Sequence, residues 1–172
     1  MYIISNNEFD LAYQIMEDSF PKSEIRTYLE LKKYFNEKKI IIYGIRYEKI
    51  LTGVIMCWEC DSCIFLENFA VNKAIRGKGL GSLLLKDIQK RYHNKLLVLE
   101  VEDPFDEISQ RRIGFYERNG FILSSYGYMQ PQINEEVNNQ PLLLMTYPKP
   151  LTDEMFSIIK DDLFKNVYML NK

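Results

Sequence analysis

The sequence has almost no excess charge of either sign. Its 22 Lys and Arg residues nearly balance its 24 Asp and Glu residues, which leaves a formal net charge of -2. A protein that binds nucleic acid or an anionic membrane through its overall field carries a large positive charge. We therefore expect neither as a partner, and any site for an anion must be built locally.

Long hydrophobic runs are also missing. The longest apolar stretches, 40–43 and 142–145, have the length of strands and fall far short of the roughly 20 residues that a membrane-spanning helix needs. Residues 1–10 carry neither the basic segment nor the apolar segment of a secretory signal. These absences predict a cytoplasmic protein without a membrane partner.

Cysteine and histidine are scarce. Cys57, Cys60 and Cys63 are regularly spaced, but an odd number of cysteines argues against a disulfide framework. Zinc usually takes four ligands in paired clusters, whereas here no second cysteine pair exists and the single histidine, His93, is distant in sequence. We therefore expect three reduced thiols and no metal ion.

The residues that are present suffice for a globular core. Of 172 residues, 47% are apolar and 27% charged, which is the balance of an ordinary soluble protein. This length fits one domain with at most a short appendage, and such a domain folds without disulfides or a structural metal.

Hydrophobic periodicity predicts strands and helices in a mixed order. The predicted strands are 2–4, 40–46, 51–58, 63–71, 96–101, 121–126 and 142–147, and the strand 96–101 looks apolar on both faces. The predicted helices are 5–20, 25–35, 81–92, 107–119 and 152–167; the second would present Ile25, Tyr28, Leu29, Lys32 and Phe35 on one face. A meander followed by β-α-β-α-β gives an α/β domain, in which a mixed sheet carries helices on both faces.

A glycine-rich turn, Arg76-Gly77-Lys78-Gly79-Leu80-Gly81, separates a predicted strand from a predicted helix. Glycines let backbone N–H groups approach a ligand, and the first turn of a helix has unpaired N–H donors, so this pattern favours a phosphate seat. It lacks the Lys-Ser/Thr ending of a Walker A loop, and its third glycine comes one residue too early for a dinucleotide fingerprint. Taken alone, three glycines are also compatible with a plain turn.

Two motifs at a separation of about forty residues resemble the GNAT superfamily of acyl-CoA N-acetyltransferases. Residues 76–81 match Arg-x-x-Gly-x-Gly, its pyrophosphate-binding signature, and 115–121 resemble its Phe-Tyr-x-x-x-Gly-Phe segment. The order of elements over 1–147 is similar too. The resemblance implies a mostly antiparallel mixed sheet in one domain, 1–147, with a C-terminal helical extension, 148–172, packed on that domain or on a dimer partner.

The resemblance also implies a site for acetyl-CoA. Its pyrophosphate would lie on the backbone amides of Gly77, Lys78, Gly79, Leu80, Gly81 and Ser82, with help from Arg76. The strand Phe69, Ala70 and Val71 would hold pantetheine, and an amide of Ala70 or Val71 would polarise the thioester carbonyl. Ser109 stands where many relatives have an asparagine that contacts the cofactor, so it departs from the family pattern.

Tyr116 and Glu67 are the candidate catalytic residues. Tyr116 occupies the position of the family's usual acid, although an aromatic side chain there also fits a core. Glu67 lies within a strand of apolar residues, where a carboxylate is costly unless it is paired or faces a cleft. By strict alternation it would share a face with Phe69 and Val71, and either it or a water chain would take the amine proton.

By the same resemblance, substrate specificity would lie with Glu24, Arg26 and the segment 126–132, in which Tyr126 and Tyr128 are candidate substrate-binding residues. The expected acceptor is a primary amine of a small molecule or a peptide. A non-catalytic acyl-CoA-binding module on the same fold is the alternative; a nucleotide hydrolase has no support from the residues.

Overall fold

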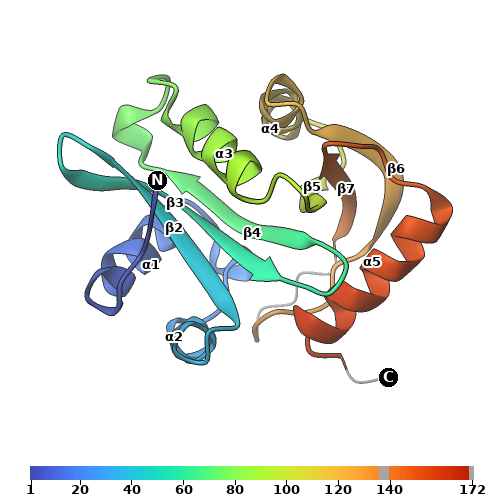
Figure 1. The fold of residues 1–172 in the computed structure, drawn as a ribbon, viewed down its shortest axis with the longest axis horizontal. Coiled ribbons are helices and arrows are strands. Elements are labelled where there is room, and N and C mark those ends of the chain that lie inside the picture. The colour runs from blue at the N-terminus through green and yellow to red at the C-terminus, as the bar shows by residue number, and fades with distance from the viewer. Residues whose placement is uncertain (136–139, 171–172) are drawn as a thin grey trace.

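A computed structural model describes residues 1–135 and 140–170, and Figure 1 shows its fold. Seven strands form one sheet in the order β1-β2-β3-β4-β5-β7-β6. They are β1 (Tyr2–Ile3), β2 (Ile40–Tyr47), β3 (Ile50–Glu59), β4 (Ile64–Val71), β5 (Leu97–Glu102), β6 (Ile122–Met129) and β7 (Pro141–Tyr147). Only β4 and β5 pair in parallel, so the prediction of a mixed, mostly antiparallel sheet is confirmed.

Helices cover both faces of this sheet (Figure 1). On one face α3 (Leu80–Arg91) and α4 (Glu107–Arg118) bury a core with β2, β3 and β5. On the other face α1 (Phe9–Glu17), α2 (Tyr28–Asn36) and α5 (Asp153–Asn166) bury a second core. We call these the α3/α4 face and the α1/α2/α5 face.

The second helix differs from its prediction. Thr27 is the N-cap, with its hydroxyl oxygen accepting from the Glu30 N–H at 3.4 Å, so α2 starts three residues later than expected. The buried stripe is consequently Leu31 and Tyr34, whereas Leu29 is 79% exposed. The predicted face was therefore right for Phe35, which packs against the core, and wrong for Leu29, because Ile25 lies outside the helix and gave the pattern a shifted phase.

The first helix is also shorter than predicted. A 3-10 turn (Asn6–Glu8) precedes α1, which ends at Glu17, four residues before Pro21.

The two central strands pair over only a short distance. β4 and β5 are matched at three positions, from Ile64 with Leu97 to Leu66 with Leu99. Beyond that point β4 runs on to Val71 and β5 to Glu102 without further pairing to each other. The sheet is therefore open between the carboxyl ends of β4 and β5, and we call this opening the central gap.

A β-bulge interrupts β4 where the gap begins. Leu66 pairs with Cys57 and Phe69 pairs with Ile55, so three steps along β4 match two steps along β3. The extra residue reverses the alternation of side chains between Glu67 and Phe69.

Helix α5 packs on the sheet of its own chain through Ile159, Leu163 and Val167. The domain boundary at 147, a homodimer and a cytoplasmic location remain predictions. In the described part of the chain, every helix is too short or too polar to cross a membrane.

Candidate active site

The glycine-rich turn forms an open backbone surface at the start of α3. Gly77 and Gly79 have φ of 86° and 76°, the left-handed region in which a side chain is strained. A Cβ built on either would meet nothing within 4 Å. Gly79 is the N-cap of α3, so the amides that follow it have no partner within the helix. This arrangement fits a phosphate group.

The two cations of the turn make contacts within the protein. Lys78 Nζ lies 2.9 Å from the Tyr47 hydroxyl and 4.3 Å from the centre of that ring. Arg76 Nε donates to the Val71 carbonyl at 3.1 Å, at the end of β4. Both partners are neutral, so the two cations keep their charge and add to the positive potential of the backbone amides and the helix dipole.

Gly81 has a packing role. A Cβ there would lie 3.2 Å from the ring of Phe115 and 3.3 Å from that of Phe69, so its absence lets α3 approach these two rings. The third glycine of the motif thus brings the phosphate seat close to β4 and α4.

The β4 backbone presents alternate amides to the central gap. Asn72, just after β4, donates its N–H to the carbonyl of Thr52 in β3 at 2.8 Å, so Asn72 and Thr52 form a hydrogen-bonded pair of the antiparallel ladder. Hydrogen-bonded pairs alternate in an antiparallel ladder, so Ala70 is also bonded to β3. The amides of Phe69 and Val71 point toward the gap instead. Of the two amides expected as donors to the thioester carbonyl, that of Val71 faces the gap and that of Ala70 faces β3, so the register favours Val71.

Tyr116 lies on the α3/α4 face. It is only 9% exposed, and its ring centre is 5.4 Å from that of Phe115, 6.4 Å from that of Phe69 and 5.8 Å from that of Phe121. Burial raises the pKa of its phenol to about 12. The hydroxyl therefore keeps its proton at any ordinary pH and remains a donor.

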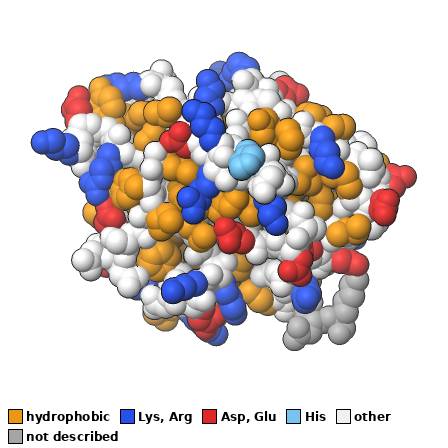
Figure 2. All heavy atoms as spheres, in the orientation of Figure 1, with side chains coloured by type: hydrophobic (Ala, Val, Ile, Leu, Met, Phe, Trp, Pro, Cys, Tyr) orange, Lys and Arg blue, Asp and Glu red, His pale blue; other side chains and the backbone are white. Residues whose placement is uncertain are grey.

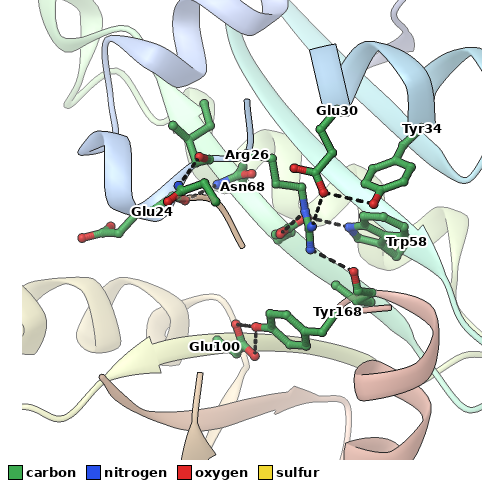
Figure 3. Close-up of polar contacts among 12 residues, drawn as sticks. Glu24, Arg26, Glu30, Tyr34, Trp58, Asn68, Glu100 and Tyr168 are labelled. Carbon is green, nitrogen blue, oxygen red and sulfur yellow. Dashed lines mark hydrogen bonds and ion pairs between the residues drawn. The ribbon is translucent and has the colours of Figure 1, made fainter. Parts of the chain in front are cut away.

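Glu67 lies on the opposite face and is held as an ion pair with Arg26. Its partners Arg26 and Trp58 are labelled in Figure 3. Its two oxygens accept from Arg26 Nε at 3.0 Å and from Trp58 Nε1 at 2.6 Å. Arg26 is 2% exposed and also donates to Glu30 at 3.0 Å and to the Val167 carbonyl at 2.9 Å. The expectation that Glu67 shares a face with Phe69 was wrong, because the bulge in β4 reverses the alternation.

Glu100 is a second carboxylate at the mouth of the gap. It directly follows Leu99, the last residue of β5 that pairs with β4. The Tyr168 hydroxyl lies 2.7 and 2.8 Å from its two oxygens (Figure 3). The Tyr128 hydroxyl also donates to Glu100. Burial raises the pKa of Glu100 to about 7, against the lowering effect of the two phenols. It is therefore half ionised near neutral pH.

Glu24 and Asn68 are two further polar residues that contact each other in this part of the fold. Burial, followed by the charge of Glu102, raises the pKa of Glu24. Asn68 Nδ2 lies 3.5 Å from the Glu24 carbonyl. Within residues 1–135 and 140–170, the buried Asn68 Oδ1 has no hydrogen-bond partner. An acceptor in that state suits a ligand that brings an N–H donor.

A family model for the Acetyltransferase (GNAT) family matches residues 9–121. The chain belongs to this family. The match includes the glycine turn, the bulged strand and Tyr116, and it ends before β6, β7 and α5.

Individual GNAT relatives extend the similarity over most of the chain. "Putative acetyltransferase YjbC" of Bacillus subtilis (strain 168) is 28% identical over 160 residues, which is 91% of this chain and 80% of that protein. A GNAT-family structure from Bacteroides thetaiotaomicron is 29% identical, covers 96% of this chain and 94% of its own, and has a TM-score of 0.88. A Bacillus subtilis acetyltransferase in complex with CoA, 12% identical, covers 84% of this chain and 94% of its own, with a TM-score of 0.60.

Two of the residues expected from the GNAT resemblance lie in contacts that leave them little role in a site. The Ser109 hydroxyl donates to the Asp106 carboxylate at 2.8 Å and to its carbonyl at 3.0 Å, so it belongs to the capping box of α4. Tyr126 stacks on Phe156 with ring centres 5.0 Å apart and donates to Asp153, so it ties β6 to α5. Tyr128, by contrast, contacts Glu100.

Sequence reasoning missed Glu100 and Tyr168 as site residues. The signal for Glu100 was present, because a carboxylate in an apolar strand is the same feature that drew attention to Glu67. Tyr168 had no signal, since it lies beyond the part of the chain that the GNAT model matches. Its position depends on how α5 docks, which one sequence does not reveal.

Proposed function

We propose that this GNAT protein transfers an acetyl group from acetyl-CoA to a primary amine of a small molecule or a peptide. The observation that carries the proposal is a pair of proton-handling groups on the two sides of the central gap. Tyr116, an acid that keeps its proton, belongs to the α3/α4 face. Glu100, a carboxylate with a pKa of about 7, bonds to tyrosines of the α1/α2/α5 face.

The residues present fit acetyl-CoA. The open backbone at Gly77 and Gly79 suits the pyrophosphate, and the gap-facing amides of Phe69 and Val71 suit pantetheine and the thioester carbonyl. When bound, acetyl-CoA would supply a thioester that accepts an amine nitrogen and releases a thiol.

The protein's own task is then to move two protons. Glu100 takes the proton that the attacking amine must lose, directly or through a water, and Tyr116 gives a proton to the departing sulfur. Glu67 is the weaker candidate for the base, because taking a proton would break its ion pair with buried Arg26. Unpaired Asn68 Oδ1 and half-buried Glu24 suit an acceptor rich in N–H donors.

The phosphate seat can be tested with Gly79→Ala. A side chain at φ of 76° is strained by about 1–2 kcal/mol, so the turn shifts and its amides no longer converge. We expect the Kd for CoA, measured by calorimetry, to rise at least about tenfold. Gly114→Ala is the matched control: it lies within α4, where alanine favours the helix, and its Cβ would meet only the flexible end of Arg118. Equal CoA affinity in both variants would contradict this seat.

The reaction itself is tested by acetyl-CoA turnover against polyamines, aminoglycosides, amino acids and peptide N-termini. We expect one class to release free CoA at a rate well above hydrolysis, with the acetylated amine found by mass spectrometry. Tight binding of CoA without turnover for any class would instead favour a non-catalytic acyl-CoA-binding module.

A further inference from the structure

A cluster of possible metal ligands lies at the opposite end of β4 from the central gap. Cys60 and Cys63 lie at the turn from β3 to β4, and Asp162 lies on α5. Their two sulfurs and one carboxylate oxygen all lie within 4.8 Å of one another, and all three residues are buried. The Cys60 N–H donates to the Cys63 carbonyl at 3.0 Å and closes the turn.

We propose that Cys60, Cys63 and Asp162 bind a zinc ion that fastens the β3–β4 turn to α5. Cys-x-x-Cys turns are a common half of zinc sites, and the fold supplies a third ligand, Asp162, which lies 100 residues beyond Ser62 of this turn. Two sulfur ligands favour zinc over the oxygen-seeking ions magnesium and calcium.

The carboxylate is already held in place. Asp162 accepts from the Ser62 N–H at 2.6 Å, from the Ser62 hydroxyl at 2.5 Å and from Asn166 Nδ2 at 2.5 Å. The Ser62 bonds fall on one oxygen and the Asn166 bond on the other, so a lone pair remains for a metal. Such outer contacts orient a ligand and are typical of metal sites.

The three side chains also have the chemistry of a cation site, because cysteine sulfur and carboxylate oxygen are both ligands that zinc accepts. A bound divalent ion deprotonates a thiol that coordinates it and offsets the charge of the carboxylate.

A cavity lies next to this turn. It has a volume of about 490 Å³ and is lined by Ser62, His93, Lys95 and Ile159, among others. The histidine of the sequence appears in pale blue among hydrophobic side chains in Figure 2. His93 lies outside the group of ligand atoms within 4.8 Å, so a water molecule would take the fourth position of the ion.

The zinc site would support the acceptor side of the active site at a distance. Figure 1 shows the β3–β4 turn lying against α5. Just beyond α5, the Val167 carbonyl accepts from Arg26 and the Tyr168 hydroxyl donates to Glu100. An ion at Asp162 would therefore hold the helix that positions these two contacts.

The test uses the full chain, reduced, stripped with a chelator and titrated with Zn²⁺ against a chromophoric competitor. We expect one ion per chain and a rise in Tm of about 5–10 °C at a hundredfold excess of Zn²⁺ over Kd. Cys60→Ser, Cys63→Ser and Asp162→Asn should each weaken binding at least about tenfold. Cys57→Ala is the matched control, because Cys57 is fully buried in the other core, and it should bind Zn²⁺ as the natural chain does.

Cobalt(II) provides a second readout that does not depend on stability. Bound at this site it should show the sulfur-to-cobalt charge-transfer absorption of thiolate ligation, and both cysteine variants should lose part of it. The proposal is overturned if the reduced chain takes up no Zn²⁺, or if Cys60→Ser and Cys63→Ser bind as tightly as Cys57→Ala. Neither readout requires acetyl transfer, so a failure of the zinc proposal can be distinguished from a failure of the proposed function.

Discussion

Replacing Tyr116 by phenylalanine should lower kcat by about 100- to 10,000-fold, the usual contribution of a general acid, and leave the Kd for CoA unchanged. The phenol is the general acid of the proposed mechanism, and phenylalanine keeps its ring packing on Phe69 and Phe115. Turnover of the best amine at saturating acetyl-CoA, together with calorimetry of CoA, measures both quantities.

The control for this variant is Tyr43→Phe. Tyr43 is a buried tyrosine of the same core, and its hydroxyl lies 2.7 Å from that of Tyr92, away from the central gap. It should cost about 1 kcal/mol of stability and leave kcat unchanged. Because the pKa of Tyr116 is about 12, the natural chain should show no loss of activity from this group up to about pH 11. Full activity in Tyr116→Phe would show that the sulfur leaves without a proton from this residue.

The sequence was informative where backbone geometry alone builds the site. Glycines at positions 77 and 79 and the following helix predict the proposed phosphate seat, because such a seat would offer N–H groups with fixed directions. Tyr116 could be proposed for a similar reason, since it lies in a short motif.

The residues on the acceptor side of the proposed site could not be predicted from short motifs in the sequence. One extra residue in β4 placed Glu67 on the opposite face from Phe69, and a strand pattern read by strict alternation has no way to include such a bulge. The contacts of Arg26 with Glu67 and Val167, and of Glu100 with Tyr168, join residues 41 to 141 positions apart. Contacts of that kind depend on how helices dock on a sheet, which local propensity does not encode.

Replacing Glu100 by glutamine should lower kcat/KM by about 100- to 10,000-fold at pH 8, because the amide cannot take the proton of the amine. In the natural chain, kcat/KM calculated per neutral amine should fall about tenfold for each pH unit below the pKa of about 7, since only the ionised carboxylate is a base. This slope should be absent from Glu100→Gln, in which only the protonation of the amine itself remains. Measurements from pH 5 to 9, with an amine whose own pKa is known, separate the two profiles.

Two further variants identify which carboxylate is responsible. In Glu67→Gln, kcat/KM should still rise with pH near pH 7. If that rise is instead lost in Glu67→Gln and retained in Glu100→Gln, Glu67 is the base. Tyr168→Phe removes one donor that favours the ionised form of Glu100, so its rise should move to higher pH.

The substitution Glu100→Gln should raise the free energy of unfolding while it lowers kcat/KM. The pKa of Glu100 is raised in the folded state, so its contribution to stability is present below the unfolded value near 4.5 and is lost as the pH rises through about 7. Above pH 7 the Glu100→Gln variant should therefore be more stable than the natural chain, by up to roughly 3 kcal/mol in urea unfolding. A variant that is inactive at pH 8 and yet harder to unfold cannot owe its inactivity to misfolding, which leaves the lost carboxylate as the cause.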